Sequence, residues 1–199
     1  MSGAPSIWPM TLADFREATA ANTATPSCGA AAVVAADLGL ALILMALRIT
    51  ESKQPDLERA RLIERAENLL IKLGAYADAD IKAFKTYMNV MKEKDEPQKE
   101  VKNATQQVVE VPLATAKACL EGVRLAKQAL PLTVEPVRSD ILSGALLLQA
   151  GLSAVLLNVD VNLSNLQETH ARDAAKRARS QLQDEADELL AELRRERVC

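Results

Sequence analysis

The chain has 199 residues, a net charge of −3, 49% hydrophobic residues and only 3% aromatic residues. This length suits a single domain over residues 1–199, and the alanine- and leucine-rich composition favours helices over a sheet, because strands prefer aromatic and β-branched residues. The slightly acidic charge excludes the basic surface that nucleic-acid binding requires, so we expect no nucleic-acid partner.

The first ten residues, MSGAPSIWPM, contain two prolines and predict a flexible tail. They lack both the basic and the apolar region of a secretory signal. The cysteines, Cys28, Cys119 and Cys199, have no paired or CxxC spacing, which is typical of a reduced protein without a zinc site. Together these features predict a cytoplasmic protein.

After a short helix capped by Thr11, the turn sequence Thr25-Pro26-Ser27-Cys28-Gly29 opens a segment that is apolar over 30–47 except for Asp37. A helix without a polar face must be enclosed by other elements. We therefore predict a central helix whose N-terminus lies in this turn. Its free backbone N–H groups would suit a polar or anionic ligand.

Three amphipathic helices are predicted around this core, over 57–92, about 99–130 and about 167–197. Pro112 lies inside the second of them, and we expect it to kink that helix without dividing it. The last one is heavily charged and carries a narrow apolar stripe at Leu182, Ala186, Leu189 and Leu193.

A second, almost wholly apolar helix is expected from 141 to 163, with Ser139 or Asp140 as its N-cap. The two apolar helices approach the length of a membrane span, but Asp37 and Gln149 interrupt them, which is costly in lipid and ordinary in a protein core. We predict no membrane partner. The expected fold is an all-α bundle of about five to six helices with two long buried central helices.

Acids in apolar surroundings are the first candidates for chemistry. Asp37 could serve as a general acid or base or anchor a substrate, or it could be a carboxylate hydrogen-bonded to a neighbouring helix. Asp78 and Asp80, two positions apart, point to different faces, so one of them is expected to be solvated. Asp140 at a helix start could be an N-cap or a catalytic group.

Asn158 and Asn162 are four positions apart and share one helix face. Two buried amides at this spacing could recognise the donor and acceptor edge of a heterocycle, or they could join two helices. No phosphate-binding loop, Ser/His/Asp set or metal-ligand cluster stands out, so no metal site is predicted.

Five segments with recognisable motifs occur in order along most of the chain. They are TPSCGAAA at 25–32, DADIKAF at 78–84, EVPL at 110–113, VRSD at 137–140 and LNVDVNL at 157–163. Together they resemble the cyclodeaminase/cyclohydrolase family, which includes the C-terminal domain of formiminotransferase-cyclodeaminase and stand-alone methenyltetrahydrofolate cyclohydrolases.

The resemblance implies an all-helical, homodimeric enzyme with a tetrahydrofolate derivative as substrate and no tightly bound cofactor. Such an enzyme hydrolyses 5,10-methenyltetrahydrofolate or closes formiminotetrahydrofolate with loss of ammonia. Both reactions need a carboxylate near a cationic carbon and a group that moves protons.

On this basis Asp80 and Asp140 are expected to be acid/base or cation-stabilising groups, with Asp37 as a third catalytic candidate. Lys53 is expected to hold a substrate carboxylate and Asn158 to bond the heterocycle. The full set of expected substrate-binding residues is Thr25, Ser27, Cys28, Gly29, Lys53, Asn158 and Asn162.

Departures from the family pattern leave two alternatives open. Ser27 and Cys28 replace two glycines of the family's glycine triplet, its basic cluster is reduced to Lys53, and Asp37 stands where a small residue is usual. One alternative keeps the scaffold and applies C–N bond chemistry to a non-folate substrate. The other is a non-catalytic helical dimer that binds partners through its charged C-terminal helix.

Overall fold

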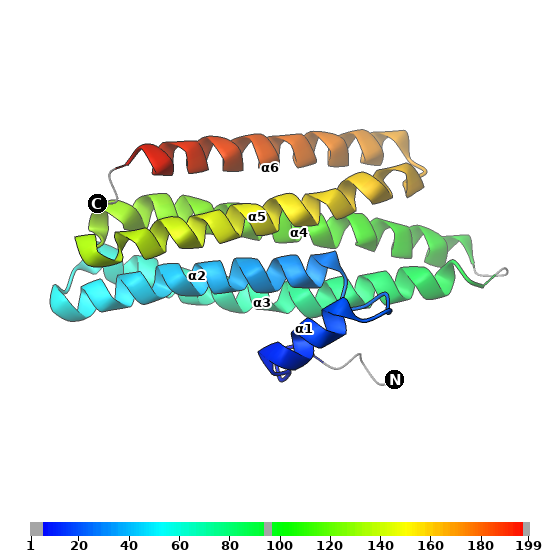
Figure 1. The fold of residues 1–199 in the computed structure, drawn as a ribbon. Helices are drawn as coiled ribbons and strands as arrows, with labels where there is room; N and C mark the ends of the chain where they lie inside the picture. The colour runs from blue at the N-terminus through cyan, green and yellow to red at the C-terminus, as the bar shows by residue number, and fades with distance from the viewer. Residues whose placement is uncertain (1–5, 94–96, 197–199) are drawn as a thin grey trace.

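The computed structural model describes residues 6–93 and 97–196; Cys199 and the first half of the predicted tail lie outside these ranges. Within them the chain forms six α-helices and no strand, which confirms the predicted all-α fold (Figure 1). The helices are α1 (Leu12–Ala20), α2 (Cys28–Lys53), α3 (Leu57–Val90), α4 (Gln98–Ala129), α5 (Arg138–Asn162) and α6 (Thr169–Arg195).

The two apolar helices, α2 and α5, run antiparallel and form the centre of the bundle (Figure 1). Their backbones touch: a Cβ atom built on Gly144 would lie 2.4 Å from the carbonyl oxygen of Gly39. Two turns further along α5, a Cβ atom built on Gly151 would lie 2.8 Å from the carbonyl oxygen of Ala32. Small residues therefore let these helices approach closely and exclude water from the contact.

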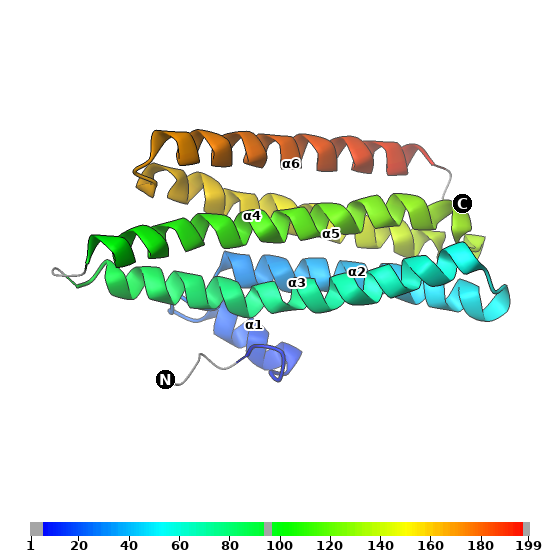
Figure 2. The ribbon, with the colours of Figure 1, turned by 180° about the vertical axis from the view of Figure 1, so that it is seen from behind.

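Helices α3 and α4 pack against the central pair and cover the side of it that faces the viewer in Figure 2. The α4 helix passes through Pro112 without ending, as predicted. By length and hydropathy alone α2 and the segment Glu135–Asn165 could also cross a membrane, with mean hydropathy of 2.4 and 1.7. In the bundle both supply the residues that fill the core.

Helix α6 forms an outer layer on α4 and α5 (Figure 1). Its buried stripe consists of Ala175, Leu182, Ala186, Leu190 and Leu193. The prediction placed Leu189 in this stripe, but Leu189 is only partly buried and Leu190 packs inward instead. Exposed ion pairs link the layer to α4, among them Arg124 with Glu185.

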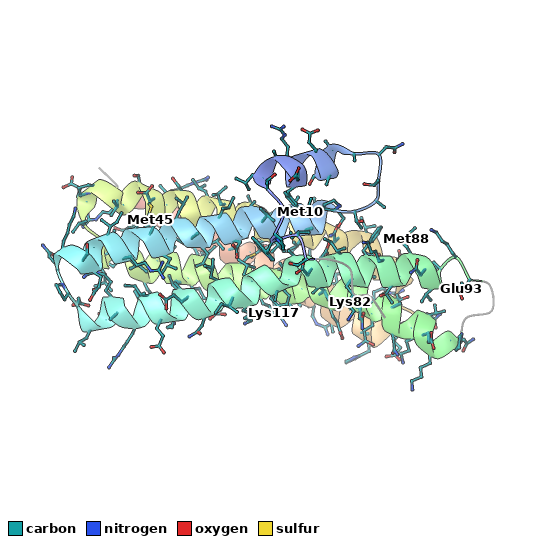
Figure 3. All side chains as sticks on the ribbon, turned by 90° about the horizontal axis from the view of Figure 1, so that it is seen from below. Met10, Met45, Lys82, Met88, Glu93 and Lys117 are labelled. Atoms are coloured by element: carbon teal, nitrogen blue, oxygen red, sulfur yellow. The ribbon has the colours of Figure 1, made fainter. Side chains whose placement is uncertain are left out.

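Figure 3 shows α1 beside the bundle, attached through the chain on either side of it. Thr11 caps α1 as predicted, accepting a hydrogen bond from the N–H of Asp14. The second half of the predicted tail packs on α3: Ile7 is buried and donates its N–H to Asp78 at 3.0 Å. The indole N–H of Trp8 donates to the carbonyl oxygen of Gly74 at 2.9 Å.

The start of α5 differs from the prediction. The helix begins at Arg138 with Val137 at the N-cap, and no side chain makes a capping hydrogen bond there. Ser139 and Asp140 therefore lie within the first turn and are not N-caps. A carboxylate in this turn still interacts favourably with the positive end of the helix dipole.

Candidate functional site

The N-terminus of α2 is capped by a side chain from another helix. Ser27 occupies the N-cap position but makes no capping bond of its own. Its hydroxyl donates instead to Asp80 of α3, with Oγ 2.8 Å from Oδ2, and the N–H of Ala30 also donates to this carboxylate. Asp80 thus satisfies backbone and side-chain donors at the start of α2, where the helix dipole favours negative charge.

Gly29 is required by this arrangement. A Cβ atom at Gly29 would lie 2.2 Å from Oδ1 of Asp80, far inside van der Waals contact. The family's glycine triplet is reduced here to one glycine, and that glycine is the one against which the carboxylate packs. The loss of the other two is compatible with this geometry, because Ser27 and Cys28 use their side chains for hydrogen bonds.

Asp80 is one of the few buried charged residues of the protein, with 7% of its surface exposed. Burial raises the pKa of its carboxyl group above the ordinary value, and the hydrogen bonds from Ser27 and Ala30 oppose part of that rise. A raised pKa brings a carboxylate closer to the range in which it can both accept and return a proton.

A chain of amides faces Asp80 from the C-terminal end of α5. The thiol of Cys28 donates to Oδ1 of Asn158 at 2.9 Å, and Nδ2 of Asn162 donates to the main-chain oxygen of Asn158 at 2.8 Å. Nδ2 of Asn165 then donates to Oδ1 of Asn162 at 3.2 Å. With its oxygen occupied, Asn158 presents Nδ2 as a donor.

The thiol of Cys28 suits the donor role. Burial and the neighbouring charge of Asp80 raise its pKa, while the hydrogen bond to Asn158 lowers it. The net direction is upward, so the group is a protonated thiol at neutral pH and donates to the amide oxygen.

These groups line one cavity of about 310 Å³. Its polar side holds Ser27, Cys28, Asp80 and the amides of α5. Its apolar side is made by Ala83, Phe84, Tyr87, Val108, Pro112 and Val161. An apolar wall opposite a few fixed donors and acceptors is typical of a site for a flat heterocycle.

The structure brings most of the predicted site residues together: Ser27, Cys28, Asp80, Asn158 and Asn162 line this cavity, and Gly29 shapes it. Thr25 lies in the loop just before them, where its carbonyl oxygen accepts from the hydroxyl of Thr23. Of the acidic pair on α3, Asp80 faces the cavity, while Asp78 binds the N–H of Ile7.

Asp37 lies elsewhere, about 15 Å along α2 from Ser27 at ~1.5 Å per residue. It lines a shallow depression with Trp8 and Gly74. Among the described residues its Oδ1 is buried without a hydrogen-bond partner, and burial raises the pKa of Asp37 to about 6. A hydrogen bond to a neighbouring helix, one of the two interpretations of Asp37, is thus absent at this oxygen within the described part of the chain.

Two predicted residues belong to the opposite end of the bundle. At ~1.5 Å per residue, Asp140 is about 27 Å from Asn158 along α5, and Lys53 is about 38 Å from Cys28 along α2. Within one chain, therefore, neither reaches the cavity.

Some cavity residues were not predicted. Phe84 ends the DADIKAF segment, and Asn165 continues the amide spacing of Asn158 and Asn162, so both had a signal in the sequence. Tyr87 follows Phe84 on the same helix face and had no signal beyond that spacing. Within 6–93 and 97–196 no group of three or more His, Cys, Asp or Glu residues is arranged to hold a metal ion.

Comparison with known proteins agrees with this geometry. Residues 11–181 match the family described as formiminotransferase-cyclodeaminase. The chain is 29% identical over 167 residues to methenyltetrahydrofolate cyclohydrolase of Methylorubrum extorquens, covering 78% of this chain and 80% of that protein. It is 29% identical over 187 residues to formimidoyltransferase-cyclodeaminase of Sus scrofa, covering 88% of this chain but 34%, about a third, of that protein.

The fold is also that of a solved structure, formiminotetrahydrofolate cyclodeaminase from Thermotoga maritima. The two chains superpose with a TM-score of 0.86 at 22% sequence identity, over 95% of this chain and 96% of the other. This likeness covers nearly the whole chain.

Proposed function

Because this chain belongs to the formiminotransferase-cyclodeaminase family, we propose that it is a folate one-carbon enzyme of the cyclohydrolase or cyclodeaminase type. It hydrolyses 5,10-methenyltetrahydrofolate or closes 5-formiminotetrahydrofolate with release of ammonia. The observation that carries this proposal is the buried carboxylate of Asp80, which lines the same cavity as the amide of Asn158, beside a group of apolar side chains.

In the hydrolytic reaction, water adds to the cationic carbon between N5 and N10 of the substrate. Asp80 accepts the proton that the water loses as the C–O bond forms, and this proton then passes to N5 as the C–N5 bond breaks. The remaining hydroxyl proton leaves to solvent as the carbonyl group of the formyl product forms. The ionised form of Asp80 also stabilises the positive charge of the amidinium group, because the two opposite charges attract each other. Asn158 donates from Nδ2 to an acceptor on the heterocycle.

In the cyclising reaction, N10 attacks the formimino carbon and loses a proton, and the amine of that carbon gains one before it leaves as ammonia. A single carboxylate can carry this proton from N10 to the leaving amine. The same residue therefore serves both reactions, and the amides of α5 hold the heterocycle in both.

Neither alternative drawn from the sequence is favoured. Asp37, whose charge suggested a changed substrate, lies outside the cavity and leaves its chemistry unaltered. The glycine on which the carboxylate packs is retained at Gly29. The relatives are named as a cyclohydrolase and a cyclodeaminase, which supports an enzyme over a non-catalytic interaction protein.

The test is to incubate the protein with 5,10-methenyltetrahydrofolate and follow the loss of its near-ultraviolet absorbance. A parallel reaction with 5-formiminotetrahydrofolate measures the ammonia released and separates the cyclodeaminase from the cyclohydrolase. We expect turnover with at least one substrate. Asp80→Asn should lower it by roughly 100-fold or more, the range for a lost acid/base group. Equal turnover by this variant would contradict the role of Asp80.

We further propose that the protein is a homodimer. Large apolar side chains of α2 and α5 remain exposed, where another copy of the chain could cover them: Leu38, Met45, Leu147 and Leu157. Met45 lies on the face of α2 seen in Figure 3 and is 38% exposed. Such an exposed apolar surface is typical of an interface.

Light scattering on the purified protein should give twice the mass of one chain, and Met45→Glu should halve it. A wild-type mass equal to one chain would rule out the dimer. Residence in the cytoplasm stays a prediction from the sequence.

A further inference from the structure

A second cavity adjoins the first. It has a volume of about 500 Å³ and lies between the end of α3, the start of α4 and the turn that precedes α6. Tyr87 and Asn165 line both cavities, so the two share a wall and lie next to each other. The second cavity is not required by the proton transfers assigned to Asp80.

The lining of this second cavity is of two kinds. Tyr87, Met91, Val101 and Leu166 give it an apolar part, which suits an aromatic ring. Lys102, Gln106 and Gln167 give it donors, of which only Lys102 carries a charge that attracts an anion. Together the two adjoining cavities are thus lined by a carboxylate and amides, by apolar side chains and by one cation.

Lys102 already binds a carboxylate in this structure. Its Nζ is 2.5 Å from Oε1 of Glu168, and the hydrogen bond and charge of Lys102 hold the pKa of Glu168 below its ordinary value. Both side chains are about 60% exposed, at 59% and 62%. An ion pair in such an exposed place contributes little to stability, so an incoming carboxylate can replace Glu168 at small cost.

The residue that the sequence suggested for this task, Lys53, lies at the far end of α2, about 38 Å from Cys28 at ~1.5 Å per residue. Lys102 is the cation that lines the space next to the Asp80 cavity. A substrate with a heterocyclic head, an aryl link and a carboxylate-bearing tail matches the kinds of groups that line the two adjoining cavities.

We propose that the second cavity binds the aryl and carboxylate-bearing portion of the substrate, and that Lys102 takes the carboxylate from Glu168. This inference rests on the proposed function for the identity of the head group. It makes Lys102 a substrate-binding residue and Glu168 a competitor that occupies the cation until substrate arrives.

The experiment compares two substrates that differ only in the tail: 5,10-methenyltetrahydrofolate, which ends in glutamate, and its 5,10-methenyltetrahydropteroyl amide analogue, in which an uncharged amide replaces the glutamate. Lys102→Gln should raise KM for the first by roughly two- to fivefold and leave KM for the second unchanged, since the lost contact is an exposed charge pair. The value of kcat should stay the same for both. Glu168→Gln should lower KM for the glutamate-bearing substrate.

Lys117→Gln is the matched control. It removes the same charge from the same helix about 22 Å away at ~1.5 Å per residue, along the body of the bundle (Figure 3). We expect wild-type KM values for both substrates. An equal KM rise for both substrates in Lys102→Gln, or no rise for either, would overturn the assignment of Lys102.

Calorimetric titration with the unreactive 5-formyltetrahydrofolate separates this inference from the proposed function. If the wild type binds this ligand but turns over no substrate, the proposed chemistry fails. A weaker binding by Lys102→Gln than by Lys117→Gln would then still support the second cavity, and equal binding by the two variants would refute it.

Discussion

At the end of the bundle where α3 begins, polar groups are occupied by one another. The buried guanidinium of Arg59 donates to the carbonyl oxygens of Leu132 and Gln54 and to the carboxylate of Glu51. At the end where α2 begins, Nδ2 of Asn158 and the carboxylate of Asp80 line an open cavity. The groups around Arg59 are satisfied by one another, whereas Asp80 and Asn158 line space that a ligand can enter.

This difference teaches how to separate structural from functional polar residues. A buried polar group is costly unless it is hydrogen-bonded, so a fully satisfied network is explained by folding alone. Groups with remaining capacity beside a cavity need a further explanation, and ligand binding supplies it. Substitutions at the two ends should therefore affect different measurements.

The largest effect on stability is expected at the satisfied end. Arg59→Met removes the charge that binds two main-chain oxygens and Glu51, and leaves these acceptors without their donor. We expect the free energy of unfolding to fall by about 3 kcal/mol. Urea denaturation measures this loss, and kcat of the folded variant should match the wild type. A fall in kcat without a loss of stability would show that Arg59 has a functional role and not a structural one.

Gly29→Ala tests the end where Asp80 and α2 meet. The added Cβ would lie 2.2 Å from Oδ1 of Asp80, so the carboxylate must move away from Ser27 and Ala30. We expect about 2 kcal/mol of destabilisation from the overpacking, and a loss of turnover out of proportion to it. Ala31→Gly, two residues further along the helix, is the control for a changed helix propensity. Wild-type activity in Gly29→Ala would show that the carboxylate can act from another position.

Asp37 lies between the two ends, and its ionisation should oppose folding. Its pKa in the folded protein is raised from 3.8 to about 6, so the folded state holds this proton more tightly than the unfolded state does. The contribution of Asp37 to stability therefore falls as pH rises from about 3.8 to about 6 and is constant above that.

Asp37→Asn removes this titration. After allowance for the partial exposure of the carboxylate, we expect the variant to be more stable than the wild type by about 1 kcal/mol at neutral pH and by less below pH 4. Thermal unfolding across this pH range, with both proteins in the same buffers, measures the difference. A difference that does not change with pH would show that Asp37 does not titrate in this window.

The smallest effect is expected for Asp140→Asn. This carboxylate lies in the first turn of α5, about 27 Å from Asn158 at ~1.5 Å per residue, so kcat should stay within about twofold of the wild type. A steady-state absorbance assay measures kcat of this variant and allows comparison with kcat of Asp80→Asn. A large loss of activity would mean that the first turn of α5 in one chain completes the site of another chain in the dimer.

Much of the fold follows from the sequence because its signals are local. Unbroken apolar runs specify α2 and α5, and helical spacing specifies the amphipathic helices around them. The hydroxyl of Thr11 caps α1 within the same turn, so it too was predictable. The start of α5 was not, because a 3-10 turn at Glu135–Val137 leads directly into the helix at Arg138 without a side-chain cap.

The site was predictable where the family motifs carry it and unpredictable where it depends on packing. Asp80 belongs to the DADIKAF motif and Asn158 to the LNVDVNL motif, although only the fold brings them to one cavity. The docking of Trp8 over Asp37 depends on a contact with α3 that no spacing reveals. Nothing in the sequence shows which of the two lysines, Lys53 or Lys102, lies near the cavity. Only their positions at opposite ends of the bundle distinguish them.

The close contact of α2 and α5 at Gly39 and Gly144 has a consequence for how such a bundle can evolve. Where two backbones touch, no side-chain change can open space, since there is no side chain to shorten. New specificity must therefore arise at the ends of the helices and in the loops, while the middle of the bundle stays fixed. Relatives with different substrates should vary near Ser27 and Asn165 and keep small residues at this crossing.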